Sequence, residues 1–213
     1  INIRYGQRTI LKDLNWLVMR GEHWALTGEN GAGKSTLLSL VCADNPQAYA
    51  CDIRLFGNKR GSGESIWDIK RRIGYVSPEM YSAYRKPLPA IDIVASGLRD
   101  TIGLYQHASE AECACCKAWL AAFDASHLAD RNYMTLSSGE QRLIMLVRAF
   151  VKNPDLLILD EPFHGLDNCY RKRAQAIIDC FMRNTRKTLI MVTHYEEELP
   201  SCIDHRLVLK KHR

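Results

Sequence analysis

The stretch Gly28-Glu29-Asn30-Gly31-Ala32-Gly33-Lys34-Ser35-Thr36 decides the fold, because it matches the phosphate-binding pattern G-x-x-x-x-G-K-[ST]. The apolar run from His23 to Gly28 predicts a strand before it, and Lys34 to Ala43 predicts a helix after it. The glycines let the backbone wrap around phosphate oxygens, and the helix start adds partial positive charge. We expect Lys34 to reach the β- and γ-phosphates of ATP and Ser35 to bind Mg²⁺. The alternative is an accidental glycine-rich turn, against which the flanking strand and helix argue.

A second motif, Leu156-Leu157-Ile158-Leu159-Asp160-Glu161-Pro162, is an apolar strand that ends in two carboxylates. Ligands gather at the carboxyl ends of strands in open α/β sheets, so Asp160 is expected to bind Mg²⁺, through water. Glu161 is expected to polarise the attacking water as a general base. Asp-Glu-Pro can also simply end a strand. Its co-occurrence with the phosphate loop favours the catalytic role.

Between these motifs lies Leu136-Ser137-Ser138-Gly139-Glu140-Gln141-Arg142, followed by an apolar helix from Leu143 to Phe150. Ser137 and Glu140 form a capping-box pattern, as do Ser109 and Glu112. Further strands are predicted at 52–56, 73–76, 188–192 and 206–209, and helix dominates from about 87 to 131. Apolar strands that alternate with helices predict a parallel sheet covered on both faces.

In this order, the motifs resemble those of ATP-binding-cassette (ABC) ATPases over essentially the whole chain. The resemblance implies an α/β P-loop NTPase of ABC type, with a mainly parallel core sheet flanked by helices, an antiparallel β part at the N-terminus and an inserted helical subdomain. We therefore expect residues 1–213 to form a single cassette in which about 87–152 are the helical signature subdomain. The distance between Lys34 and Asp160 leaves no room for the long coiled coils of chromosome-maintenance and break-repair relatives.

The resemblance also assigns roles that the residues alone do not establish. Tyr5 matches the aromatic residue that stacks on adenine, and His194 matches the switch histidine that contacts the γ-phosphate. Asp167 matches the D-loop at the dimer interface. The signature Ser137-Ser138-Gly139-Glu140 is expected to close over ATP held by the phosphate loop of a second ABC cassette, in the same polypeptide or in a homodimer.

Three positions depart from the family pattern. Glu79, in Ser77-Pro78-Glu79, stands where the family has Gln, and we expect it to keep a metal-site role because a carboxylate binds Mg²⁺ more strongly than an amide. Ser138 replaces the first signature Gly, and Glu140 replaces the signature Gln. The Glu140 carboxylate is expected to bond back to the helix start, where the helix dipole favours it.

Four segments are similar to those of the bacterial tandem-cassette ABC proteins linked to molybdenum transport and once described as photorepair proteins. They are Ile73–Glu79, Asp92–Gly97, Ile102–Tyr105 and Leu136–Arg142. The chain resembles the second cassette of that group. Because it opens inside a predicted strand and without an initiator Met, we expect it to be a fragment of a longer protein.

Composition excludes several other classes. The chain has 213 residues with 46% hydrophobic content, enough for one buried core, and no run approaches the roughly 20 apolar residues of a membrane span. We expect a cytoplasmic protein that reaches the inner face of the plasma membrane only through a partner. The eight cysteines lack metal-site spacing and are expected to be buried, reduced thiols. The net charge of +5 comes from separated basic clusters, which would have to converge to bind nucleic acid.

Three functions remain open from the sequence. The first is an ATP-hydrolysing cassette that energises transport, with molybdate or molybdenum as the expected solute, through a membrane permease. The second is a soluble, non-transport ABC ATPase that acts on nucleic acid or a ribonucleoprotein. The third is a nucleotide-dependent regulatory module with negligible turnover, against which Glu161 argues.

Overall fold

The computed structural model describes residues 1–102 and 108–211. Most of the motif expected at Ile102–Tyr105 therefore lies outside the described residues, as do His212 and Arg213. The core is a five-stranded sheet with the strand order β6-β7-β8-β3-β9, in which every pairing is parallel. The strands are β3 (His23–Gly28), β6 (Ile73–Val76), β7 (Leu156–Asp160), β8 (Thr188–Val192) and β9 (His205–Leu209).

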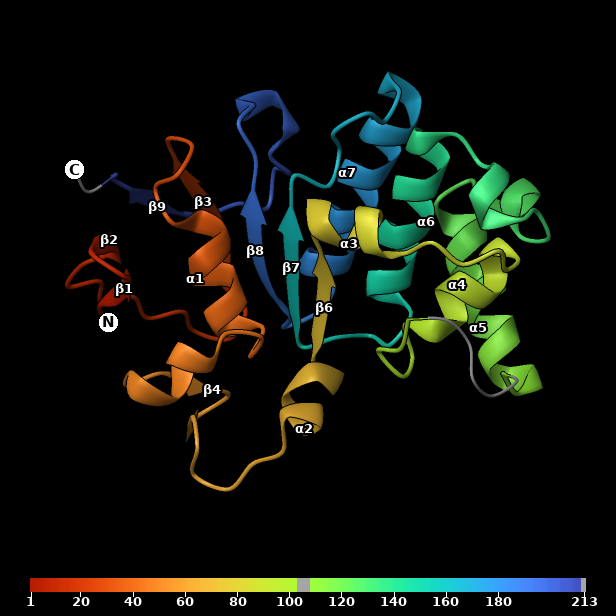
Figure 1. The fold of residues 1–213 in the computed structure, drawn as a ribbon. Helices are drawn as coiled ribbons and strands as arrows, with labels where there is room; N and C mark the ends of the chain where they lie inside the picture. Colours follow the sequence, from red (N-terminus) through yellow and green to blue (C-terminus); the bar gives the residue numbers. More distant parts are fainter. Residues whose placement is uncertain (103–107, 212–213) are drawn as a thin grey trace.

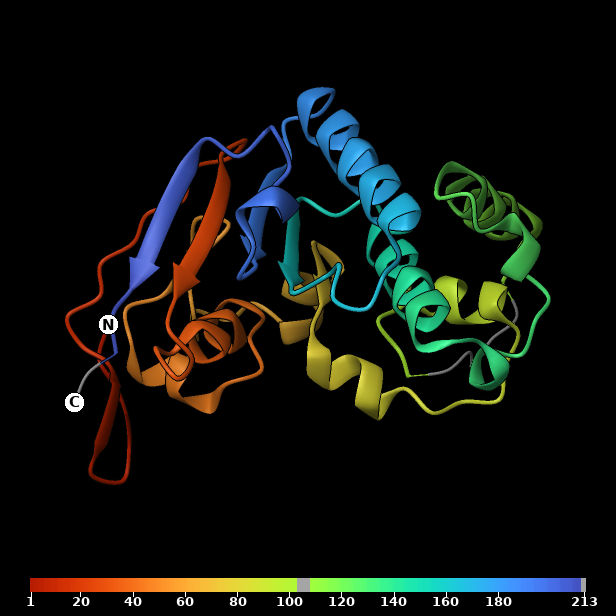
Figure 2. The same ribbon diagram turned by 90° about the horizontal axis from the view of Figure 1, so that it is seen from above.

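Both faces of the sheet are covered, as the near-continuous apolar strands predicted. Because side chains alternate along a strand, Leu157 and Leu159 of β7 face one cluster, while Ile158 faces the other. The first cluster packs against helices α6 (Ser138–Phe150) and α7 (Asn168–Arg183), and the second packs against α1 (Lys34–Val41). Figure 2 shows α1 and α7 on opposite sides of the sheet. The predicted fold class is confirmed.

An antiparallel pair, β1 (Ile3–Tyr5) and β2 (Arg8–Leu11), forms the expected N-terminal β part. The strand expected at 52–56 is wrong in extent, because only β4 (Arg54–Leu55) forms there and it pairs with β5 (Asn58–Lys59) in a separate sheet. The backbone turns at Phe56 (φ 53°) and Gly57 (φ 90°), which ends β4 at once. The predicted helix from Lys34 ends at Val41, two residues early, because Ala43 has a positive φ of 62°.

The region that lacked β signal is helical where it is described. Figure 1 places these helices beyond β6, on the opposite side of the sheet from β1 and β2. A cluster of aromatic rings from three helices, Trp119, Phe150 and Phe181, joins the region to α7. Both predicted capping boxes are present, at Ser109 and at Ser137. The remaining helices are η1 (Pro46–Ala50), α2 (Ile66–Arg71), α3 (Pro78–Ala83), α4 (Ala90–Ser96), α5 (Glu110–Ala122), η2 (Ser126–Leu128), η3 (Tyr133–Thr135) and η4 (Glu196–Glu198).

The expectation for the cysteines holds only in part. All eight are free thiols, and Cys42 and Cys116 are buried. Cys169 and Cys180 are exposed, which contradicts the expectation that the thiols are buried. Both lie on α7, whose buried residues are instead Ala174, Ile178 and Met182. Composition indicates how often cysteines are buried, but the face that a helix turns inward decides each case.

The basic clusters lie on separate elements, and several of their side chains have partners within the chain. Figure 1 shows α2 below the sheet and β9, which precedes the third cluster, at the left edge, while Figure 2 shows α7 against the face opposite α1. In α2, Lys70 pairs with Asp44 at 2.5 Å, and the neighbouring Arg72 pairs with Asp155 at 2.8 Å. In α7, Arg173 donates to the Ala122 carbonyl. In the part of the chain that the structure describes, these clusters therefore do not converge in space, which was the condition for a nucleic-acid surface.

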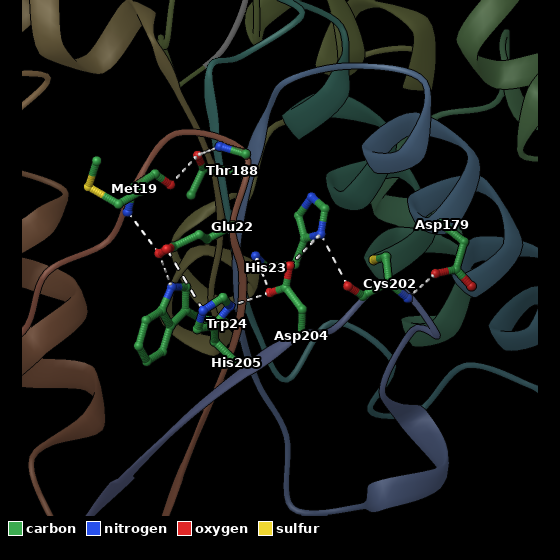
Figure 3. Close-up of polar contacts among 10 residues, drawn as sticks. Met19, Glu22, His23, Trp24, Asp179, Thr188, Cys202, Asp204 and His205 are labelled. Carbon is green, nitrogen blue, oxygen red and sulfur yellow. Dashed lines mark hydrogen bonds and ion pairs between the residues drawn. The ribbon is translucent and has the colours of Figure 1, made fainter.

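The amino ends of the strands carry a polar cluster that the sequence did not indicate (Figure 3). Asp204 accepts a hydrogen bond from the His23 amide at 2.8 Å and lies 2.6 Å from the His205 Nδ1. Glu22 accepts from the Met19 amide and from the Trp24 indole, and the His205 ring stacks on Trp24 at 4.8 Å. Each of these residues has at least one polar partner, and the His23 Nδ1 lies 3.1 Å from the Cys202 carbonyl oxygen, whereas the His23 Nε2 is buried without a partner among the described residues. It ties β3 to β9 at the end of the sheet opposite the phosphate loop.

Candidate functional site

The phosphate loop follows β3 and enters α1, as the motif predicts. Its glycines are required by conformation and by space. Gly33 has a φ of 97°, and a Cβ there would lie 2.8 Å from Leu11. Gly28 has a φ of 145°, and its Cβ would lie 2.4 Å from the Leu209 carbonyl oxygen. A larger residue at either position would push the loop away from the strands that hold it.

The N-terminus of α1 has free amide donors that could bind an anion. Gly33 provides no side-chain cap and the first turn contains no acidic residue, so the first amide N–H groups of the helix lack side-chain acceptors. The Lys34 ammonium lies over the loop and donates to the carbonyls of Gly28 at 2.7 Å and Glu29 at 3.1 Å. Amide donors, the helix dipole and one buried cation together form a phosphate-binding site.

A cleft of about 370 Å³ surrounds this loop. Most of the predicted nucleotide, metal and catalytic residues line it: Asn30, Gly31, Gly33, Lys34, Ser35, Thr36, Glu79, Asp160, Glu161 and His194. They come from the loop, α3, the end of β7 and the segment after β8, so the sheet brings together segments far apart in sequence. Arg8, Ile10 and Pro78 also line the cleft and were not predicted. No local sequence motif predicts that these three residues line the cleft. The only available signal was their closeness in sequence to Tyr5 and Glu79.

Two carboxylates at the end of β7 differ in environment. Asp160 is only 4% exposed, and burial, followed by the charges of Glu161 and Glu79, raises its pKa to about 6. Glu161 is about one-third exposed and lies 3.2 Å from the His194 Nε2. Its backbone is in the left-handed region, with a φ of 49°, which is uncommon for a residue other than glycine. This conformation directs the chain sharply away from the strand at the residue predicted to be the base.

The cleft fits a hard divalent cation. Asp160 is a buried carboxylate beside two others, and the Lys34 charge and hydrogen bonding to Ser35 only partly offset the rise in its pKa. Carboxylate and hydroxyl oxygens are the ligands that Mg²⁺ prefers, and the ion would neutralise this concentration of negative charge. Ser35 and Asp160 would hold such an ion, and Glu79 lines the same cleft.

Tyr5 is separate from the cleft lining. Its ring is 51% exposed, and its hydroxyl accepts a hydrogen bond from Asn45 at 2.9 Å. That bond ties the side chain to the segment that follows the C-terminal end of α1. Adenine stacking on Tyr5 stays a prediction.

The signature segment forms the N-terminus of α6. Ser137 accepts from the Glu140 amide at 3.2 Å, and Glu140 accepts from the Ser137 amide at 2.7 Å and from Arg131 at 2.9 Å. The backbone bond to Ser137 and the nearby Arg131 lower the pKa of Glu140. The predicted structural role of Glu140 is confirmed. The Ser137 proton remains available to a phosphate, because its hydroxyl serves the cap only as an acceptor.

The signature and D-loop contact each other but do not reach this cleft. A Cβ on Gly139 would lie 2.9 Å from the Gly165 carbonyl oxygen, which leaves no room for a side chain. Asp167 caps α7 by accepting from the Tyr170 amide at 2.9 Å. Ser137, Ser138, Gly139, Glu140 and Asp167 are absent from the described residues that line the cleft, as are Gly28, Glu29 and Ala32 of the loop itself.

Comparison with known proteins now decides the family. A family model described as "ABC transporter" matches residues 11–164. The chain belongs to the ABC transporter family. It is 46% identical to the ABC transporter ATP-binding protein ModF of Escherichia coli (strain K12), over 96% of this chain and 42% of that protein. It is 33% identical to the uncharacterized ABC transporter ATP-binding protein YlmA of Bacillus subtilis (strain 168), over 99% of this chain and 80% of that protein.

Other members are informative about length and fold. The uncharacterized ABC transporter ATP-binding protein C323.04 of Schizosaccharomyces pombe is 36% identical over 97% of this chain and 42% of its own length. The chain thus spans less than half of the two curated relatives ModF and C323.04. Among solved structures, the dimeric post-hydrolysis state of the ATP-binding cassette MJ0796 bound to ADP and Pi has a TM-score of 0.82 at 22% identity, over 100% of this chain and 93% of that one. This likeness shows the ABC cassette fold.

In the described part of this ABC cassette, none of the helices combines the length and the apolar character needed to cross a membrane.

Proposed function

We propose that this chain binds and hydrolyses ATP as one member of a cassette pair. The carrying observation is the cleft itself, in which the phosphate loop, Asp160, Glu161, His194 and Glu79 line one space although they lie far apart in sequence. Family membership supports the same activity, since ABC cassettes as a family bind and hydrolyse ATP.

The proposed reaction follows from the placement of these groups. Loop amides and Lys34 hold the β- and γ-phosphates, and Ser35 and Asp160 would hold Mg²⁺, which would supply positive charge for the transition state. Glu161 accepts a proton from water as the water oxygen bonds to the γ-phosphorus, and the bond from that phosphorus to the bridging oxygen breaks to give ADP and phosphate. His194, 3.2 Å from Glu161, orients the carboxylate and the water. Glu79 faces the same space and is proposed to contact the metal's water shell.

The second half of each site is proposed to come from another cassette. Ser137 and Gly139 lie outside the cleft of their own chain, so they can serve only a phosphate loop that approaches from elsewhere. The dimeric MJ0796 cassette structures support a paired arrangement for this fold. The partner is proposed to be a second cassette in the same full-length polypeptide, or else a second copy of this chain.

ATP hydrolysis by the purified full-length protein tests the activity, with Lys34→Ala as the variant expected to lose nucleotide binding.

Ser137→Ala tests the signature and should abolish hydrolysis while ATP binding persists. Because this change also removes a helix cap worth about 1 kcal/mol, Ser109→Ala is the matched control. It removes the equivalent cap of α5, far from the cleft. Equal activity in both serine variants would contradict the proposed role of the signature, and an inactive wild-type protein would indicate a regulatory module.

Self-pairing has its own test. If two copies pair, mixing Lys34→Ala with Ser137→Ala chains leaves one intact site in each mixed dimer, which is roughly a quarter of all sites for random two-fold pairing. Activity should therefore reappear in the mixture. A mixture that stays inactive while both variants still bind to each other would contradict shared sites between copies.

We further propose that the pair energises transport, with molybdate or another molybdenum compound as the solute. The support is the sequence resemblance at 73–79, 92–97 and 136–142 and the likeness to ModF. Co-purification of the full-length protein with integral membrane subunits tests it, together with stimulation of ATPase activity by molybdate but not by sulfate. Stimulation by RNA, ribosomes or DNA would instead favour the non-transport alternative, for which the separated basic clusters give no support.

A further inference from the structure

Arg8 is a basic residue in the nucleotide cleft that no phosphate-loop motif includes. It lies on β2 directly opposite Tyr5 of β1 in the antiparallel register. Side chains of directly opposed residues project from the same face of a pair of strands. Arg8 therefore shares its face with the residue proposed to stack on adenine.

The Arg8 guanidinium also approaches the phosphate loop. A Cβ built on Gly31 would lie 3.5 Å from the Arg8 Nη2 and 3.9 Å from the Lys211 Cε. Thus two exposed cationic side chains, one from β2 and one from beyond β9, flank the same turn of the loop. Within residues 1–102 and 108–211, neither has a hydrogen-bond or ion-pair partner.

The absence of a partner distinguishes Arg8 from Arg131 and Arg148, two arginines of the helical region. Arg131 is paired with Glu140, and the Arg148 guanidinium donates to Ser96 and to the Thr101 carbonyl. The cleft contains the carboxylates Glu79, Asp160 and Glu161, but these lie at the strand ends and on α3, and none forms an ion pair with Arg8. A free guanidinium against a loop built to bind phosphate is best explained by an anionic ligand.

We propose that Arg8 is a nucleotide-binding residue that contacts the phosphate tail of a nucleotide held in the loop, with Lys211 as a weaker second contact. This rests on the proposed ATP-binding function. The planar guanidinium can donate two parallel hydrogen bonds to phosphate oxygens, which the exposed ammonium of Lys211 cannot match. Tyr5 on the same face then holds the base, while Arg8 holds the charged tail.

Equilibrium binding of ATP, ADP and adenosine to the purified protein tests this assignment. Arg8→Gln should weaken ATP and ADP binding about tenfold and leave adenosine binding within about twofold, because only the phosphate contact is lost. Lys211→Gln should weaken ATP binding about threefold, as expected for an exposed ion pair made by a single ammonium group. Arg8→Lys should restore part of the affinity, and the salt dependence of ATP binding should decrease in Arg8→Gln.

Arg4→Gln is the matched control. Arg4 lies on the same hairpin next to Tyr5, pairs with Thr9 and projects from the opposite face, so the variant removes the same charge without touching the cleft. Equal ATP affinity in Arg8→Gln and Arg4→Gln would overturn the proposal. An equal loss for ATP and adenosine would also overturn it, since the guanidinium would then contact the base. If the wild-type protein binds no nucleotide, the proposed ATP-binding function is itself wrong. If the wild-type protein binds nucleotide and Arg8→Gln binds it equally well, only the role proposed for Arg8 is wrong.

Discussion

The two ends of β7 each carry an aspartate, and the two are held in opposite ways. Asp155 precedes the strand and is paired with Arg72 at 2.8 Å and Lys187 at 3.2 Å. Burial alone would raise the pKa of Asp155, but these two partners lower it below its ordinary value. Asp160 ends the strand, buried beside Glu161 and Glu79, and its pKa is raised to about 6. The same contrast extends across the sheet, since Glu22 and Asp204 at the amino ends also have lowered pKa values.

The carboxylates at the amino ends of the strands stabilise the fold, whereas those at the carboxyl ends lack sufficient partners unless a ligand is bound. At the amino ends, the charged groups already have their partners inside the chain. At the carboxyl ends, the carboxylates of Asp160, Glu161 and Glu79 gather in one cleft and the charge of Lys34 offsets them only in part, which is unfavourable until a cation enters. The carboxylates at this end therefore lower the stability of the ligand-free protein, and this loss of stability accompanies the proposed function.

Removing the Glu161 carboxylate should have the largest effect. Glu161→Gln keeps the size of the side chain but cannot accept the proton from water, so kcat for ATP hydrolysis should fall about 10²- to 10⁴-fold with ATP binding retained. Glu197→Gln, an exposed carboxylate on η4, is the control and should retain full activity. Comparable rates in the two variants would remove Glu161 from the reaction.

Neutralising Asp160 should stabilise the ligand-free protein. A pKa of about 6 against an ordinary 3.8 means that ionisation at pH 7 costs the folded state up to about 3 kcal/mol. Asp160→Asn should therefore raise the free energy of unfolding by about 1 to 3 kcal/mol in EDTA without nucleotide, while it abolishes hydrolysis. Urea unfolding measures the change. A destabilised Asn variant would show that the aspartate is satisfied within the chain.

Asp155→Asn should act in the opposite direction at the other end of the strand. The pair is partly exposed, so the loss at pH 7 should be only about 1 kcal/mol. Because the folded pKa is lowered, this stabilisation is fully present above the ordinary pKa near 4 and is lost as the pH falls through the lower folded pKa. The difference in unfolding free energy between the two proteins should therefore become smaller between pH 7 and pH 3, and a difference that does not change with pH would assign the loss to packing.

The smallest effect is expected from His205. Its hydrogen bond to Asp204, together with the charge of Glu22, raises the His205 pKa above 6.5. A raised folded pKa stabilises the protein fully below the unfolded value, and the contribution is lost as the pH rises through the folded one. The melting temperature should fall slightly between pH 6.5 and 8.5, and less so in His205→Gln than in the exposed control His127→Gln. Identical slopes in the two variants would show that the cluster in Figure 3 does not sense pH.

Local patterns were sufficient for much of this molecule. The phosphate loop, the strand before Asp160 and both capping boxes are short-range signals, and each was predicted from neighbouring residues. The order of the strands and the pairing of His23 with Asp204 were not predictable, because both depend on contacts between residues far apart in the sequence. His23 and Asp204, for example, are separated by 181 positions. Arg8 was missed for the same reason: nothing beside it in sequence indicates that β2 leads it to Gly31. The exposed Cys169 and Cys180 were missed because composition carries no information about helix orientation.

The left-handed backbone at Glu161 has a consequence for mutational scans of this cassette. A conformation with a φ of 49° is tolerated by Gly and Asn but strained for β-branched residues, whatever their chemistry. If all substitutions at this position were ranked by abundance in cells, Gly and Asn should therefore score well, whereas Val and Ile should be depleted through misfolding. Inactivity of a Val variant would say nothing about proton transfer. A comparison of Glu with Gln, which has a similar size and backbone preference, separates the carboxylate's chemistry from the shape of the main chain that carries it.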